Sequence, residues 1–379
     1  MAGAIRTILA GAAGAVIMTA TAQAGGFSRG TADTDILFEE GNFNLRAGAT
    51  IVAPQRDYET ITNSPLPTSA LLGLTPGATV NGTDGRFSDT YVVPSSAIKL
   101  NFTDDARCAG THTQSFGANA SYGPQAILAG QADGTGLVSR EFSTYELGLT
   151  CAYKFDTGPI GGLGNGRAWI IGGVFLEDLT FTETVRFSGP VLQAGGVDAA
   201  TAGALDGTDG VLAFNGEYEL GYRIGLAFEI PEIAARAQIL YRSAVNHDPG
   251  GTFTALGAAV PTSGAGTLPQ SVELKMQSGI APGTLVFGSV KWTDWSVFDQ
   301  FNYSVLAGPF AGPRDLEFAW TDGWTVSAGI GRQFNDWLSG SVNLTWDKGV
   351  STTEDVFTDT WTLASGVAIT GERGELRFG

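Results

Sequence analysis

The sequence predicts an all-β transmembrane barrel, and three observations support this fold class. From Tyr218 to Ile230 large apolar residues occupy every second position, between small and charged ones. A period of two is typical of a strand with one apolar and one polar face, and about 13 residues can cross a bilayer at a tilt. Glycine accounts for 54 of 379 residues and charged residues for only 16%, which disfavours a soluble helical protein. Long and short connections also alternate along the chain, as in outer-membrane barrels.

The N-terminus has the pattern of a secretory signal peptide. Arg6 precedes an apolar and small run from Ile8 to Ala20, and residues 22–24 (Ala-Gln-Ala) provide a small-x-small cleavage site. A membrane anchor is the alternative, but the run is short and rich in Ala and Gly. We expect residues 1–24 to be removed and the mature chain to begin at Gly25.

Twelve segments alternate like strands and follow one another as hairpins. The segments are residues 42–53, 90–102, 106–118, 140–155, 167–185, 212–230, 234–247, 270–281, 284–297, 320–334, 337–347 and 359–370. Their tight turns are expected on the periplasmic side, and their longer Gly-, Thr-, Asp- and Pro-rich loops outside. The longer loops are residues 56–89, 119–138, 186–211, 248–268, 298–318 and 348–358. Tryptophans near strand ends, Trp295 and Trp320 among them, are expected at the membrane–water interface, although ordinary packing would explain some of them.

Cys108 and Cys151 are the only cysteines, and they fall on consecutive predicted strands, each far from the connecting loop. They can face one another and form a disulfide in an oxidising compartment. The alternative is two unpaired thiols, since Cys151 lies on an apolar face. With only His112 and His247 beside them, we predict no metal site and no cofactor.

Charge excludes some function classes. The chain carries 38 acidic and 21 basic residues, with no cluster of Lys and Arg, so nucleic acid is a poor partner. A lipase would need a serine, a histidine and an acidic or amide partner, and neither His112 nor His247 lies in such a motif. We predict that the protein is not an enzyme.

Several stretches resemble one family of membrane proteins. Residues 268–298 (LPQSVELKMQSGIAPGTLVFGSVKWTDWSVF) open a strand with Leu-Pro and close the next with Trp-Ser-x-Phe. Residues 241–253 (YRSAVNHDPGGTF), PSSAIKL near Pro94 and SFGANASYG near Ser115 add to this. These motifs are similar to those of the FadL-type outer-membrane transporters of long-chain fatty acids and other hydrophobic compounds.

The resemblance implies a barrel of about fourteen strands in the outer membrane of a Gram-negative bacterium. An N-terminal hatch, here residues 25–41, would close the lumen. Substrate would be captured on outer loops, move to an internal site and leave through the wall of a monomeric barrel. The family's Asn-Pro-Ala hatch motif is missing, because residues 36–43 read ILFEEGNF.

The barrel is expected to occupy residues 42–379. About twelve or thirteen strands fit within the chain, and its end, from Gly374 to Gly379, looks like the opening of a strand. Since an open barrel leaves unpaired backbone groups in lipid, we expect that the last one or two strands are lacking.

Candidate ligand-binding residues are both apolar and basic. Phe27 stands in the family's N-terminal Gly-Phe, which reaches into the binding pocket, and Ile36, Leu37 and Phe38 are hatch residues that either line the same cavity or only fill the barrel. A desolvated carboxylate needs a cation, and Arg186 aligns with a basic residue that the family places at its internal site. By alternation the basic residues facing inward are Arg223, Arg236, Arg242, Lys275 and Lys291. Each of these has a lumenal salt bridge as its alternative role.

The predicted function is therefore outer-membrane transport of long-chain fatty acids or similar hydrophobic compounds, with membrane lipid around the barrel. Apolar residues in loops 186–211 and 248–268, such as Val191, Leu192, Leu205 and Leu256, suit a landing patch for substrate. A general diffusion porin, or a structural or adhesive barrel, is the alternative. A porin would need an open, charged eyelet and no hatch.

Overall fold

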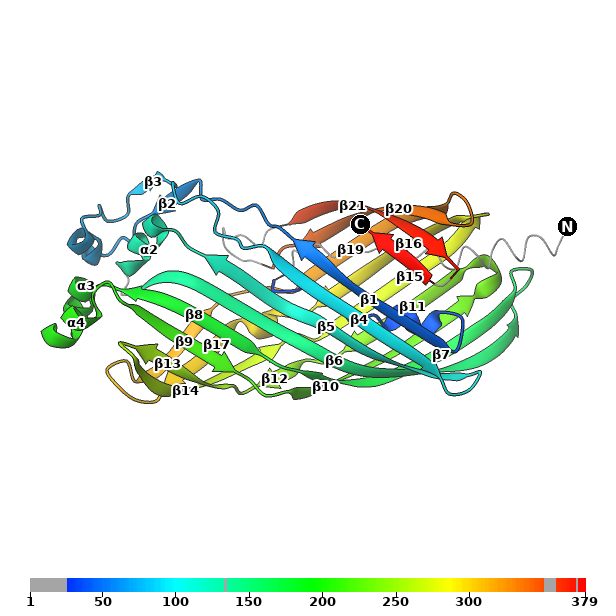
Figure 1. Ribbon diagram of the computed structural model, residues 1–379, viewed down its shortest axis with the longest axis horizontal. Helices are drawn as coiled ribbons and strands as arrows, with labels where there is room; N and C mark the ends of the chain where they lie inside the picture. Colours follow the sequence, from blue (N-terminus) through cyan, green and yellow to red (C-terminus); the bar gives the residue numbers. More distant parts are fainter. Residues whose placement is uncertain (1–25, 133–134, 351–358, 373) are drawn as a thin grey trace.

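The computed structural model describes residues 26–132, 135–350, 359–372 and 374–379. The described chain forms an elongated antiparallel barrel with short helices at one end and tight turns at the other (Figure 1). The expected signal peptide, residues 1–24, lies outside the described residues. No helix within the described ranges is long and apolar enough to cross a membrane.

The barrel wall is a run of antiparallel strands, each paired with the next. In order these are β1 (Phe43–Val52), β4 (Tyr91–Asn101), β5 (Ala106–Ser121), β6 (Thr135–Pro159), β7 (Asn165–Glu177), β10 (Glu219–Ile230), β11 (Ala235–Arg242), β15 (Ser271–Ala281), β16 (Thr284–Thr293), β19 (Gly323–Gln333), β20 (Leu338–Lys348), β21 (Thr360–Gly371) and β22 (Gly374–Phe378). The pairings described for β1 join it to β4, and those for β22 join it to β21. Further strands after Gly379 stay a prediction.

The wall has the two-faced pattern that the sequence predicts. Along β10, Leu220, Ile224 and Leu226 are more than half exposed, whereas Arg223 and Ala227, at alternate positions, are buried. The apolar face therefore lies outside, where lipid surrounds it, and the polar face lies in the lumen.

At the helical end the wall continues through a second set of strands, paired in the order β6, β8, β9, β13, β14, β17 and β18, with β12 beside β14. Their bounds are β8 (Thr180–Phe187), β9 (Asp209–Asn215), β12 (Val245–His247), β13 (Gly250–Ala255), β14 (Ala258–Leu268), β17 (Gln300–Val305) and β18 (Gly312–Glu317). This arrangement corrects four predicted strands, because 167–185, 212–230 and 234–247 are each interrupted and 284–297 stops at Thr293. It also corrects three predicted loops, since 56–89, 248–268 and 298–318 contain paired strands.

Short helices and a small ladder cover the outer end (Figure 1). They are η2 (Pro67–Leu72), α2 (Pro124–Gln131), α3 (Gly189–Ala194), α4 (Ala199–Leu205) and the small ladder of β2 (Thr60–Thr62) and β3 (Thr79–Asn81). Leu192 and Leu205 are buried against Phe187 under α3 and α4. The predicted landing patch is therefore mostly core, although Leu256 is 55% exposed.

Cys108 and Cys151 are directly opposite in the β5–β6 ladder, and the structure joins them in a disulfide with a Cα–Cα distance of 3.9 Å. Two tryptophans depart from the interface prediction. Trp295 is fully buried and Trp320 is 4% exposed, both in a cluster of aromatic rings inside the barrel. That cluster leads to the functional site.

Candidate functional site

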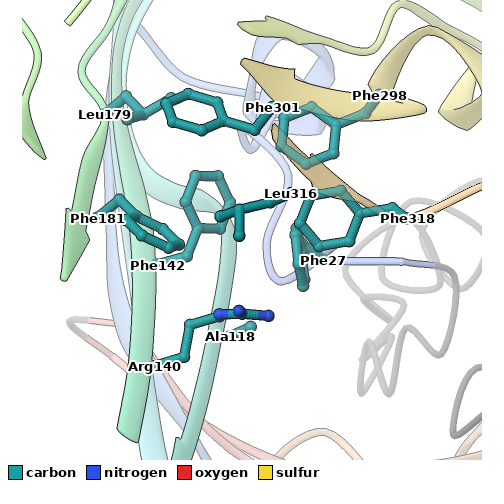
Figure 2. Close-up of a pocket in the computed structure, with 10 residues that line it drawn as sticks. All are labelled: Phe27, Ala118, Arg140, Phe142, Leu179, Phe181, Phe298, Phe301, Leu316 and Phe318. Atoms are coloured by element: carbon teal, nitrogen blue, oxygen red, sulfur yellow. The ribbon is translucent and has the colours of Figure 1, made fainter. Parts of the chain in front are cut away.

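A pocket lined mainly by aromatic rings lies inside the barrel, where β7 gives way to β8. It encloses about 360 Å³ of empty space, including the part open to solvent. Figure 2 shows six phenylalanine rings and two leucines converging on it, with Arg140 at one side. The lining residues of this aromatic pocket are Phe27, Ala118, Arg140, Phe142, Leu179, Phe181, Phe298, Phe301, Leu316 and Phe318.

Breaks in the strands bring these side chains inward. Between β7 and β8, the carboxylate of Asp178 accepts a hydrogen bond from the Tyr145 backbone N–H at 2.6 Å, and the next residue, Leu179, is 1% exposed. After β16 the chain forms a 3-10 turn, η4 (Trp295–Phe298), in place of a continued strand. Both end residues of η4 are buried against the hatch. The Trp-Ser-x-Phe motif thus builds the pocket instead of closing a strand.

Phe27 of the hatch forms one side of the pocket. Its ring centroid lies 4.7 Å from that of Trp320, 5.1 Å from Phe142 and 5.5 Å from Phe318. Gly26 before it has a φ of +54°, and a Cβ there would lie 2.7 Å from Trp295 Cε2. Backbone conformation and packing therefore both require the glycine of the Gly-Phe motif.

The hatch also completes the barrel wall. The β4–β5 ladder stops at the pair Ser95–Thr113. Directly after Thr113, β5 has a bulge between Gln114 and Phe116 in its ladder with β6. Beyond it β5 bonds to the hatch, since Arg29 N–H donates to Ser115 O at 3.0 Å and Gly117 N–H to Phe27 O at 2.8 Å. The wall is thus separated between β4 and β5 at the level of the aromatic pocket.

Arg29 fills that separation. Its guanidinium lies 3.5 Å from the ring centroid of Tyr91 in β4 and donates hydrogen bonds to Asn119 Oδ1 at 2.7 Å and Gln114 Oε1 at 3.3 Å in β5. The residue is 4% exposed. A Cβ on Gly117 would lie 2.6 Å from Arg29 Nε, so glycine leaves room for this side chain.

A second cavity of about 630 Å³, including its open part, lies beside hatch residues from Ser28 to Thr34. We call it the polar cavity. Its charged lining residues are Glu146, Arg223, Arg242, Glu273, Lys275 and Lys291.

Ion pairs account for most of the predicted lumenal cations. Arg223 Nη2 lies 2.5 Å from Glu146 Oε1, and Arg242 Nε lies 3.1 Å from Glu146 Oε2. Arg242 also pairs with Glu177. The polar cavity therefore contains a buried network in which each carboxylate has a cation partner.

The foot of the hatch is held in a similar way. Lys275 Nζ lies 3.0 Å from Asp35 Oδ2, and Arg236 Nη2 lies 3.6 Å from Asp35 Oδ1. Burial raises the pKa of the Asp35 carboxyl, but these two cations outweigh it and lower the pKa to about 2.

The other hatch candidates lie away from the aromatic pocket. Ile36 and Leu37, in η1 (Thr34–Phe38), are fully buried in a separate cluster with Trp169 and Ile171. The ring centroid of Phe38 is 5.6 Å from that of Trp169. The structure thus brings Phe27 to the pocket and places the other three residues as filling of the barrel.

Arg186 also lies away from both cavities. It stands at the outer end of β8 with its side chain 41% exposed, and its Nε and Nη2 lie 2.8 Å and 3.0 Å from the two carboxylate oxygens of Asp209. The cation at the aromatic pocket is instead Arg140, whose Nε donates to Glu183 Oε2 at 2.7 Å. Sequence reasoning missed Arg140 and Arg29, because neither has a local signal.

Comparisons with known proteins agree with this architecture. Residues 36–369 match the model of the family described as "Outer membrane protein transport protein (OMPP1/FadL/TodX)". The chain belongs to this family. It is an outer-membrane protein of a Gram-negative bacterium, and its family consists of transporters of hydrophobic compounds.

Solved structures share the fold at low identity. A FadL homologue from Pseudomonas aeruginosa matches with a TM-score of 0.62 and 12% identity, over 89% of this chain and 79% of that one. The toluene transporter TbuX of Ralstonia pickettii matches with a TM-score of 0.55 and 13% identity, over 89% of this chain and 83% of that one. The toluene transporter TodX of Pseudomonas putida matches with a TM-score of 0.55 and 14% identity, over 93% of this chain and 87% of that one. No curated protein sequence matches the chain.

Proposed function

We propose that this protein carries long-chain fatty acids, or compounds of similar hydrophobicity, from the cell exterior into the outer membrane. Substrate enters from the helical end, occupies the aromatic pocket and leaves through the wall between β4 and β5. The observation that carries the proposal is an apolar pocket inside a barrel lumen whose second described cavity is lined by charged side chains.

The lining of the pocket favours an apolar group. Nine of its ten residues are apolar, and the tenth, Arg140, is already paired with Glu183. Burying a methylene group is worth about 0.8 kcal/mol, whereas an unpaired carboxylate in such a place is strongly disfavoured. The pocket therefore suits the hydrocarbon part of a substrate.

The exit route follows from two adjacent hatch residues. Phe27 closes the pocket and Arg29 fills the separation in the wall, and only Ser28 lies between them. A substrate that displaces Phe27 pulls on the backbone hydrogen bonds that hold the hatch to β5. Withdrawal of this segment would open the pocket toward lipid in one movement.

A second candidate substrate class is monoaromatic hydrocarbons. Six phenylalanines around the pocket offer ring faces and edges to an aromatic guest. Two structural neighbours are named as toluene transporters. A guest of this class is smaller than a fatty acid and would displace fewer of the lining side chains.

The test is direct binding of palmitate and of toluene to the protein purified in non-ionic detergent. Ala118 lines the pocket with a small side chain, so Ala118→Trp is expected to fill the pocket and to weaken binding of both ligands more than tenfold. Leu128→Trp, on the outer helix α2, is the matched control and should bind like wild type.

Each outcome is informative. Equal binding by wild type and Ala118→Trp would contradict the assignment of the pocket. Absence of binding together with steady ion conductance in planar bilayers would favour a diffusion porin. Retention of a folded barrel is checked by its resistance to unfolding in dodecyl sulfate at room temperature.

A further inference from the structure

The polar cavity carries an excess of positive charge in an acidic protein. Four cations and two carboxylates line it, whereas the whole chain has 21 basic and 38 acidic residues. A lining cation without a carboxylate partner can attract a ligand of the opposite sign.

Three of the four cations already have carboxylate partners. Arg223 and Arg242 bind Glu146, Arg242 also binds Glu177, and Lys275 binds Asp35. These pairs neutralise one another inside the lumen. Among the four lining cations, Lys291 is the one for which no carboxylate partner is described.

Lys291 has acidic neighbours but forms no ion pair with any residue that the structure describes. In the β15–β16 ladder it stands opposite Glu273, yet the Glu273 carboxylate lies 3.7 Å from Lys275 Nζ. On its other side it stands opposite Thr325 of β19, with Asp347 one strand further. In the described part of the chain, no carboxylate oxygen lies within the 4.0 Å ion-pair distance of Lys291 Nζ.

Apolar side chains connect the aromatic pocket with the polar cavity. The ring centroid of Trp295 lies 6.3 Å from that of Phe27, and the ring of Phe116 lies 5.3 Å from Trp295. Phe116 lines the polar cavity together with Leu240 and Pro269. The two cavities are therefore separated only by apolar rings, which a hydrocarbon chain would displace on its way from one to the other.

We propose that the polar cavity is a second substrate-binding site, in which Lys291 binds the carboxylate of a hydrophobic acid. This assignment rests on the proposed function and deepens it. The aromatic pocket accepts apolar groups regardless of charge, and Lys291 selects compounds that carry an anionic head. A fatty acid and an aromatic acid share the required chemistry.

The expected preference for an acid over the matching alcohol follows from the bond between Lys291 and the carboxylate. A hydrogen bond to a charged group contributes about 1.5–3 kcal/mol, which corresponds to about 10- to 100-fold in affinity. An acid should therefore bind at least tenfold more tightly than an alcohol with the same hydrocarbon part. Removal of the ammonium group should erase this ratio without weakening the alcohol.

The experiment measures binding to the full-length protein in non-ionic detergent at pH 8, where the acids are ionised. Palmitate is compared with hexadecanol, and benzoate with benzyl alcohol. Each pair is measured with wild type, Lys291→Met and Arg186→Met. Arg186 is the matched control because it is a cation that lines neither cavity.

The proposal expects an acid preference in wild type and in Arg186→Met, and its loss in Lys291→Met. A preference in the palmitate pair or in the benzoate pair supports the site and identifies the source of the carboxylate. An acid preference that survives in Lys291→Met, or that disappears in Arg186→Met, overturns it. Equal binding of acid and alcohol by wild type contradicts carboxylate binding at Lys291 but leaves the proposed transport function standing. Binding of none of the four compounds refutes both the carboxylate site and the proposed function.

Discussion

The contact of Arg29 with the wall makes a quantitative prediction about the closed hatch. Arg29→Met keeps much of the side-chain volume but removes the hydrogen bonds to Asn119 and Gln114, at 2.7 Å and 3.3 Å, and the cation over Tyr91. The shorter charged hydrogen bond and the cation–π contact together stabilise the closed hatch by about 3 kcal/mol. Loss of that free energy shifts the ratio of closed to open hatch by about 100-fold.

Hydrogen exchange measures this ratio directly. The Gly117 amide donates to Phe27 O at 2.8 Å and the residue 29 amide to Ser115 O at 3.0 Å, so both exchange only when the hatch leaves β5. In Arg29→Met both amides should exchange about 100-fold faster, while amides of the β5–β6 ladder keep their rates. Arg186→Met serves as the control for loss of a cation elsewhere. Unchanged exchange at Gly117 would refute the assignment of Arg29 as the contact that holds the hatch closed.

Three further predictions follow from other contacts. Gly117→Val places a Cβ 2.6 Å from Arg29 Nε, so it should speed exchange of the residue 29 amide, and wild-type rates would contradict the fit described here. Glu146→Gln removes a 2% exposed carboxylate that bonds two arginines, and it should lower the free energy of unfolding by about 3–5 kcal/mol, measured in urea; a loss below 1 kcal/mol would be inconsistent with a buried network. Because the pKa of Asp35 is lowered to about 2, its stabilisation should be constant above about pH 4 and fade as the pH falls toward 2. The test compares the urea midpoints of unfolding of wild type and Asp35→Asn between pH 8 and pH 2. A difference between the two midpoints that has already disappeared at pH 6 would contradict the prediction.

Much of the wall could be predicted from the sequence, because its pattern is local. Alternation along β10 identifies both faces of the strand from consecutive residues. The predicted cysteine pair also lies directly opposite in its ladder, because the two cysteines fall on consecutive strands and both lie far from the connecting loop. Alternation does not reveal where a strand stops crossing lipid, so the breaks at Asp178 and after Thr293 were missed.

The binding site depends on contacts that no local pattern encodes. Phe27 of the aromatic pocket was predicted, from its motif, but Arg29 lies 90 residues from Asn119 and carries no signal of its own. The pairing of Arg223 with Glu146 spans 77 residues. Alternation therefore indicates that a basic residue faces the lumen, and only the folded barrel shows which of these cations have a carboxylate partner among the described residues.

The central claim is that hydrophobic compounds pass the aromatic pocket and leave when the hatch separates from β5. Ser28 and Phe116 form an isolated bridge, so the double variant Ser28→Cys, Phe116→Cys can be joined reversibly by a disulfide. Uptake of labelled palmitate and toluene is measured in cells that lack their own transporter. Wild type and Phe116→Cys are measured under the same redox conditions. The account predicts that the oxidised double variant is blocked and that reduction restores uptake, whereas equal uptake in both states would contradict it.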